Sequence, residues 1–339
     1  MRIMESRAQM RKEKTMDRIG GATGLVRRLM LGSIVLLASI SLLAGCGRQQ
    51  AESPESSSSA DVADTSSRAG SSCVIVDDAF SNLQMTDPTI PVYDKYTLSE
   101  RRAKGLTTTM PDLTPYKEGK VVYLTFDDGP DEKNTPAILD ILKENGVQAT
   151  FYVTGQHAEL HPDVLQRIYA EHHAIGNHSY DHDYKKLYVS PETFLSEMER
   201  TDEIIHGILG VRPLILRAPG GVIGHFTKAY DPALKASGYV EHDWNVSSAD
   251  AAPNHPVAQD FIDNIDSQTD KPVAAHAAII LMHCSEGHEE TVKALPEIIR
   301  ILKGEGLYLR RHHTDDTAAL VMYAVWESIE PDLLKRTGL

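Results

Sequence analysis

Two adjacent carboxylates, Asp127 and Asp128, are the first side chains in this sequence with types and spacing suited to chemistry. They lie in the segment TFDDGP at 125–130, where the glycine and proline predict a sharp turn after an apolar run. Two consecutive side chains point in different directions from such a turn, so one carboxylate could bind a cation while the other acts as a base. Taken alone, an Asp-Asp-Gly-Pro segment is also typical of a solvated turn without chemical function.

Two histidines four residues apart, His178 and His182, could supply nitrogen ligands. Side chains at i and i+4 can converge on a metal ion, although the chain has fifteen histidines and most of them must lie on the surface. With Asp128 they make a set of two imidazoles and one carboxylate, which leaves coordination positions open for water and substrate. Iron, cobalt and nickel are compatible with such a set.

Two later segments carry further candidates. Arg217, in RAPGG, could pair with a carboxylate and orient it, while Gly220 and Gly221 would let a backbone N–H approach a developing oxyanion. A loop with a structural salt bridge explains that segment equally well. His283, in LMH, could serve as a general acid if a carboxylate such as Asp250 keeps it protonated.

Short apolar runs that alternate with amphipathic stretches predict the elements that position these residues. About seven strands alternating with helices indicate an α/β fold, and a barrel accommodates that number more naturally than a doubly wound sheet. The candidate residues follow the strands at their C-terminal ends, where barrel enzymes place their sites. The expected strands are 121–126, 150–153, the segment around Ile175, 214–216, 240–246, 279–282 and 307–309, and the expected helices are 135–145, 162–171, 190–209, 228–236, 257–265 and 292–303.

The ordered motifs TFDDGP, HSYDH, RAPGG, WNVSSAD and LMH resemble those of the polysaccharide deacetylases with the NodB homology domain, the fourth carbohydrate esterase family. The resemblance covers residues 118–311. It implies a deformed (β/α) barrel with about seven parallel strands, usually zinc-bound, that hydrolyses acetyl groups from N-acetylated sugars and sometimes from O-acetylated ones. The expected enzyme is therefore a polysaccharide N-deacetylase.

The resemblance also implies a role for each matching residue. Asp127 is the general base, positioned by Arg217, and His283 is the general acid, tuned by Asp250; the metal ligands are Asp128, His178 and His182. On the substrate side, Gly220 contributes its N–H to the oxyanion hole, Leu281 is a wall of the acetyl pocket, and Trp244 lies near the substrate. Two positions depart from the family pattern. Gly220 stands where an aromatic residue is frequent, and Ala251 follows Asp250 where tryptophan is frequent. The missing rings leave sugar stacking, and with it the substrate, open.

The N-terminus predicts export and a lipid anchor. Eight basic and three acidic residues precede the apolar run Leu29–Gly45, and small residues precede Cys46, as in a bacterial lipoprotein signal at 1–45. An uncleaved signal anchor is the alternative. We expect a Ser-rich tether at 46–72, an irregular extension at 73–117, the catalytic domain at 118–311 and a helical extension at 312–339. A Cys73–Cys284 disulfide is left open.

Net charge and expected location reduce the range of possible substrates. Without residues 1–45, 34 basic and 48 acidic residues become 26 and 45, a net charge of −19 that argues against nucleic acid as a partner. A lipid on Cys46 would hold the enzyme at the extracellular face of the bacterial cytoplasmic membrane, with part of it released. This favours peptidoglycan or a related N-acetylglucosamine polymer, including a chitin-like one. An O-acetyl esterase of xylan-type polymers and a non-catalytic envelope-binding lipoprotein are the alternatives, and no protein partner is inferred.

Overall fold

The computed structural model describes residues 73–83, 90–113, 121–269 and 277–310. All of them belong to one compact unit, Ser66–Leu339. The expected signal peptide, the tether with Cys46 and the C-terminal extension at 312–339 lie outside the described residues. Within the described ranges, no helix combines the length and the apolar character that a membrane span requires.

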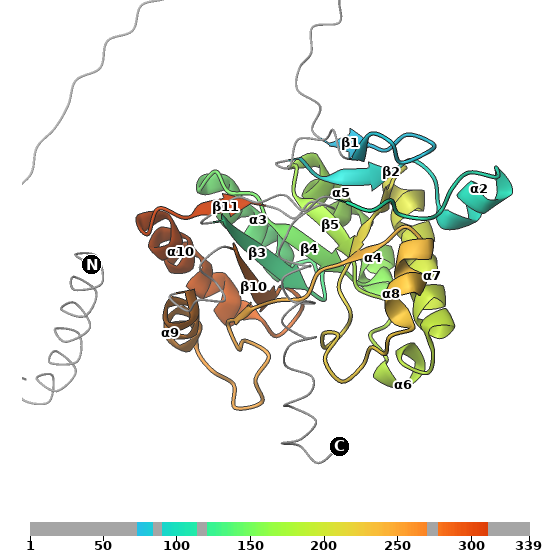
Figure 1. Cartoon of the computed structure of the whole chain (residues 1–339). Coiled ribbons are helices and arrows are strands. Elements are labelled where there is room, and N and C mark those ends of the chain that lie inside the picture. The colour runs from blue at the N-terminus through green and yellow to red at the C-terminus, as the bar shows by residue number, and fades with distance from the viewer. Residues whose placement is uncertain (1–72, 84–89, 114–120, 270–276, 311–339) are drawn as a thin grey trace, which may run out of the picture. The chain divides into compact units, whose positions relative to one another are not determined.

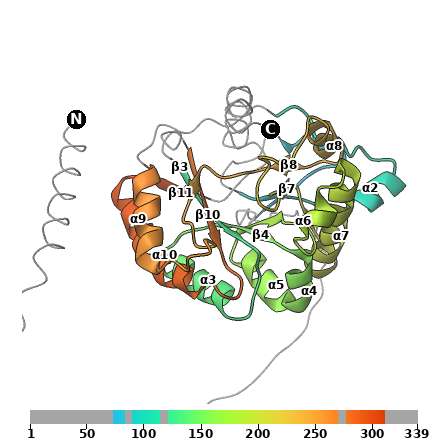
Figure 2. The same ribbon diagram turned by 90° about the horizontal axis from the view of Figure 1, so that it is seen from below.

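A parallel sheet forms the centre of this unit (Figure 1). Its strands follow the order β8 (Val240–Glu241), β7 (Ile215–Leu216), β5 (Ala174–Asn177), β4 (Thr150–Val153), β3 (Val121–Asp127), β10 (Ala277–His283) and β9 (Val246–Ser247), and β11 (Tyr308–Arg310) pairs with the beginning of β3. Helices follow one another along the outside of these strands (Figure 2). The predicted (β/α) barrel with about seven parallel strands is confirmed as a partly open barrel.

The two faces of β3 explain how the sheet serves both packing and chemistry. All seven of its residues are buried. Val122, Leu124 and Phe126 belong to the large core beneath the helices, whereas Tyr123 belongs to a separate cluster on the opposite face. Because side chains alternate along a strand, Asp127 lies on the same face as Tyr123.

The strand β10 repeats this alternation beside β3. Ile280 and Met282 join the large core, and Ile279 joins the inner cluster. The two strands pair in parallel over their whole length, with His283 opposite Asp127. The inner face therefore brings the last residues of both strands to one end of the barrel.

The helices occupy the spans α3 (Asn134–Glu144), α4 (Gly155–Leu160), α5 (Pro162–Ala170), α6 (Tyr184–Leu187), α7 (Pro191–Leu209), α8 (Tyr230–Ala236), α9 (Ala258–Thr269) and α10 (Glu289–Gly304). The short helices α4 and α6 are absent from the sequence-based expectation. The longest helix, α7, begins after Ser190, which forms a capping box with Thr193, and ends at Gly210 with φ 74°. These are strong local start and stop signals, and they explain why the predicted span agrees with the structure.

Two segments differ from the sequence-based expectation. The predicted strand 240–246 is divided into β8 and β9, because Arg217 donates hydrogen bonds to the carbonyls of His242 and Asp243 between them. The segment expected to be irregular contains β1 (Val74–Ile75), β2 (Val92–Asp94) and α2 (Leu98–Ala103). The strand β2 pairs with β1 and, in antiparallel register, with β6 (Arg212–Pro213), so this segment is built onto the barrel.

Candidate metal and catalytic site

Asp127 is held in place by Arg217 at the end of β3. Its side chain is 3% exposed and accepts a hydrogen bond of 2.8 Å from Nη1 of Arg217, which also donates to Thr125 Oγ1 at 2.7 Å. The Arg217 guanidinium is itself buried, with its carbon 4.2 Å from the centre of the Tyr152 ring. Burial raises the pKa of Asp127 and outweighs the attraction of Arg217 and His283. The carboxylate is thus oriented by a fixed partner and made more basic by its surroundings.

Asp128, His178 and His182 converge as the sequence predicts. Their ligand atoms all lie within 4.8 Å of one another, with Asp128 Oδ1 at 3.5 Å from His178 Nε2 and 3.6 Å from His182 Nε2. Ligands of a tetrahedral zinc at about 2.0–2.1 Å are roughly 3.4 Å apart, close to these separations. Asp128 Oδ1 is buried and accepts no hydrogen bond from the described residues. An unpaired carboxylate oxygen between two imidazole nitrogens fits a divalent cation.

The backbone around these ligands is strained in a way that supports a functional site. Asp128 has φ 69°, Ser179 has φ 67° and His182 has φ 56°, in a region that residues other than glycine seldom adopt. His178 Nδ1 lies 2.9 Å from the Arg217 carbonyl, and a proton donated there leaves Nε2 free to bind a metal. Burial lowers the pKa of His178 to about 3, which keeps the ring neutral as a ligand must be.

His283 and Asp250 form a hydrogen-bonded pair at the end of β10. His283 Nδ1 lies 2.9 Å from Asp250 Oδ1, and the His283 backbone N–H donates to Asp250 Oδ2 at 2.7 Å. Thr291 donates to the same oxygen. Burial lowers the pKa of His283, but the hydrogen bond and charge of Asp250, with the charges of Asp127 and Asp128, outweigh it and raise that pKa to about 9. This imidazole can hold a proton at neutral pH.

The remaining predicted residues surround this centre. Gly220 and Gly221 form a turn with φ 73° and 81°, and the Gly221 N–H donates to the Ala218 carbonyl. Leu281 is 9% exposed on the inner face of β10. Trp244 packs with the inner cluster, and its ring would lie 3.0 Å from a Cβ placed on Gly221. The structure therefore brings every sequence-predicted site residue to the same end of the barrel.

Three residues of the site were not among the sequence-based candidates. His157, at the start of α4, has Nδ1 2.5 Å from the Asp128 carbonyl. Asn177 accepts a hydrogen bond from the Ser179 N–H and donates to Asp202 Oδ1, which anchors the HSYDH loop. Tyr184 lies beside His182 and Gly220. Only Asn177 carried a sequence signal, as a polar residue at the end of a buried strand.

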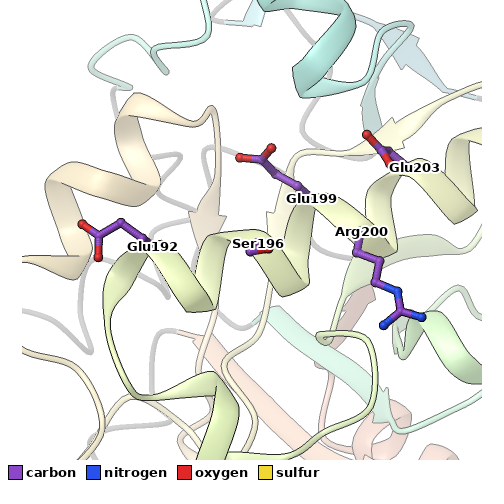
Figure 3. A pocket seen from close by; sticks show the side chains of 5 residues that line it. All are labelled: Glu192, Ser196, Glu199, Arg200 and Glu203. Atoms are coloured by element: carbon purple, nitrogen blue, oxygen red, sulfur yellow. The ribbon is translucent and has the colours of Figure 1, made fainter.

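Two further clusters of polar side chains lack Asp127 and Asp128, although the first of them shares Asp250 and His283 with this centre. Asp250, His283 and His288 also place their ligand atoms within 4.8 Å, but Asp250 is already engaged by His283. A hollow of about 340 Å³ on the outer side of α7 is lined by Glu192, Ser196, Glu199, Arg200 and Glu203 (Figure 3). Glu199 forms an ion pair there with Arg102, which neutralises part of the negative charge of the hollow. Neither cluster includes the strand ends that carry Asp127 and Asp128.

The cysteines are not linked to each other. Cys284 is a free, buried thiol, and Cys73 Sγ lies 3.2 Å from the Tyr169 hydroxyl. The disulfide that the sequence leaves open is therefore absent. Cys284 instead packs against the turn after Asp127, where a Cβ on Gly129 would lie only 2.4 Å from its sulfur.

Comparison with known proteins finds relatives that are similar in sequence and in overall fold. The sequence profile described as polysaccharide deacetylase matches residues 115–241. A peptidoglycan-N-acetylglucosamine deacetylase of Bacillus cereus is 32% identical over 221 residues, which cover 64% of this chain and 78% of the relative. The peptidoglycan-N-acetylmuramic acid deacetylase PdaA of Bacillus subtilis is 31% identical, covering 55% and 68% respectively. A crystal structure of a Bacillus cereus polysaccharide deacetylase aligns with a TM-score of 0.53 and 33% identity, over 57% of this chain and 92% of that one.

Proposed function

Because this chain belongs to the polysaccharide deacetylase family, we propose that it is a metal-dependent enzyme that removes N-acetyl groups from an N-acetylglucosamine-type polymer. The family consists of hydrolases that act on N-acetyl amides, so deacetylation is the activity of this chain. Peptidoglycan is the favoured polymer, because the relatives named above act on its two sugars and the N-terminal sequence predicts an anchor at the cell envelope. The observation that carries the proposal is the metal-ligand set Asp128, His178 and His182 beside Asp127 and His283.

Asp128, His178 and His182 would hold the metal, with zinc as the proposed ion. Such an ion polarises a carbonyl oxygen and makes a water ligand more acidic. The protein contributes a neutral imidazole at His178 and the otherwise unpaired oxygen of Asp128. One carboxylate and two imidazoles also leave the remaining coordination positions open for water and substrate.

Asp127 is proposed to take the proton from the attacking water. Arg217 holds the Asp127 carboxylate through Oδ1, which leaves Oδ2 to accept that proton. Attack on the acetyl carbon converts the amide carbonyl into a tetrahedral oxyanion, to which the Gly220 N–H is proposed to donate a hydrogen bond. The Leu281 side chain and the Trp244 ring would bound the space for the acetyl group.

His283 is proposed to complete the reaction. Its Nδ1 proton is fixed on Asp250, so the Nε2 proton is the one available to the leaving sugar nitrogen. Transfer of that proton breaks the C–N bond and gives acetate and a free amine. Nε2 lies 4.0 Å from Asp128 Oδ2, which places the acid beside the proposed metal site.

The proposal is tested by acetate release from N-acetylglucosamine oligomers by the wild type and by Asp127→Asn. We expect turnover by the variant to fall by about 10²–10⁴-fold, because the amide cannot accept a proton. Bound metal, measured on the same samples, should be unchanged, since Asp127 is outside the ligand set. Near wild-type turnover at full metal occupancy would remove Asp127 as the base, and turnover of acetylated xylan in place of the oligomers would reject the N-deacetylase assignment.

We also propose that a lipid on Cys46 holds the enzyme at the outer face of the cytoplasmic membrane. Support comes from the basic segment, the apolar run and the small residues that precede Cys46. Cys46→Ser should shift the protein from the membrane fraction, and mass spectrometry of the wild-type N-terminus should find the lipid.

A further inference from the structure

The ring of Tyr184 occupies the space next to Gly220. A Cβ placed on Gly220 would lie 2.7 Å from Tyr184 Cε1 and 2.8 Å from its hydroxyl oxygen, so a side chain at 220 would displace the ring from this position. Gly220 also has φ 73°, a conformation that favours glycine. The two residues come from separate segments, so the absence of a side chain at 220 is what lets the Tyr184 ring reach this position.

Tyr184 is directly beside the proposed metal ligands. Its ring meets the His182 ring edge to face, with centroids 5.1 Å apart. It is 43% exposed, one of the few large, partly apolar side chains with so much surface among the described residues. A flat aromatic ring is thus presented to solvent at the rim of the site.

The surroundings of Tyr184 hold the ring without covering it. Its centroid is 5.6 Å from that of His225 and 6.1 Å from that of Tyr188. Tyr188 stacks on His225 and donates its hydroxyl proton to the Pro219 carbonyl at 2.6 Å, which fixes the turn that contains Gly220. Tyr188 packs against a buried cluster formed around Phe194 and Tyr230, whereas Tyr184 is not part of that cluster. Packing of the core therefore does not account for the position of Tyr184.

We propose that Tyr184 is a sugar-binding residue, on whose ring a pyranose of the polymer stacks while an acetyl group reaches the metal site. This inference rests on the proposed function and specifies its substrate contact. Sugar rings carry C–H groups on one face and hydroxyls at the edge, so a partly exposed ring of tyrosine suits them, with an apolar body and a polar tip. Gly220 serves the same contact by making room for the ring.

The test compares Tyr184→Ala and Tyr184→Phe with the wild type on N-acetylglucosamine oligomers. Acetate release gives kcat and KM, and calorimetry on the same proteins in the Asp127→Asn background gives the dissociation constant. We expect Tyr184→Ala to raise both KM and the dissociation constant about tenfold, in the range of a lost aromatic contact, with kcat within about threefold. Tyr184→Phe keeps the ring and should stay within about threefold in all three quantities.

Two measurements separate stacking from a structural role. Bound metal should be unchanged in Tyr184→Ala, because a loss there would mean that the ring only supports His182. Val189→Ala, which removes an apolar side chain that is 70% exposed in the same segment, should leave KM unaltered. An unchanged KM and dissociation constant in Tyr184→Ala would overturn the inference. Oligomer binding by the wild type without acetate release would instead reject the proposed function and leave the contact standing.

Discussion

At the scale of single residues, the two proton-handling groups are set apart by their neighbours. Burial raises the pKa of Asp127 despite the Arg217 guanidinium, while Asp250 raises the pKa of His283 to about 9 despite burial. A base of increased basicity and an acid that stays protonated are the pair that amide hydrolysis requires. The cause differs between the two groups, because burial dominates at Asp127, whereas the hydrogen bond and charge of Asp250 dominate at His283.

Replacing Asp250 should therefore change the protonation of His283. In the metal-free wild type, we expect the His283 ring to titrate near pH 9 by NMR. In Asp250→Asn the pKa should fall toward the ordinary value of about 6.5, because the hydrogen bond and charge of Asp250 are lost and only the charges of Asp127 and Asp128 still oppose the effect of burial. A His283 pKa that stays near 9 in the variant would show that Asp250 does not set it.

The raised pKa of His283 predicts that the free energy of unfolding decreases as the pH rises. The folded-state pKa is above the unfolded one, so the protonated ring favours the folded state. The contribution is complete below about pH 6.5 and is lost as the pH rises through about 9. Urea unfolding of metal-free protein across this interval should show the decrease, and Asp250→Asn should lack it.

At the scale of elements, a buried ion network joins the N-terminal strands to the barrel. Arg101 and Arg212 are fully buried, and both bond to Asp94 on β2. Arg212 also bonds to Asp202 on α7, at 3.2 Å. Through Asn177, Asp202 is connected to the loop that carries His178. The small sheet is thus coupled to the elements that position a proposed metal ligand.

Removing one member of the network should be costly. Asp202→Ala leaves the Arg212 charge buried with only Asp94 beside it, and loss of one partner of a buried pair costs about 3–5 kcal/mol. Chemical denaturation should show that loss in the free energy of unfolding. Arg300→Ala is the matched control, because Arg300 is 70% exposed and a solvent-screened pair such as the one with Glu297 should contribute little to stability. Equal effects of the two substitutions would contradict the proposed importance of the buried network.

The elements also show what the sequence can and cannot predict. The helix at α7 and the strands β3, β4 and β10 follow from local signals, and the candidate residues at the strand ends follow from contiguous motifs. The pairing of β2 with β6 and the contact of Tyr184 with Gly220 join segments far apart in the chain. Periodicity carries no information on such contacts, because two- and three-residue strands are too short to show a pattern.

At the scale of the whole molecule, metal binding should stabilise the folded protein in addition to supporting its catalytic activity. The ligand atoms come from the loops after β3 and β5, so the site is complete only when the barrel is folded. At a free metal concentration one hundredfold above the dissociation constant, binding adds about 2.7 kcal/mol to the free energy of unfolding. Chelation should abolish acetate release and lower the melting temperature, and zinc should restore both.

Asp128→Ala provides the control for this effect. It removes one of the three proposed ligands, so zinc should no longer raise the melting temperature of the variant by the same amount. An equal rise in the wild type and the variant would indicate that the stabilising ion binds elsewhere.

The pairing of β10 with β3 sets His283 opposite Asp127 on neighbouring strands. Adjacent strands are about 4.8 Å apart in a sheet, so the proposed acid and the proposed base are spaced by a backbone ladder and not by a loop. Insertions into the intervening connections can then change which polymer reaches the centre without altering the distance between the two groups. A shift of one residue in this pairing, in contrast, would turn one of them to the opposite face. The connecting loops can therefore vary in evolution while the pairing of β3 and β10 keeps His283 and Asp127 at a constant spacing.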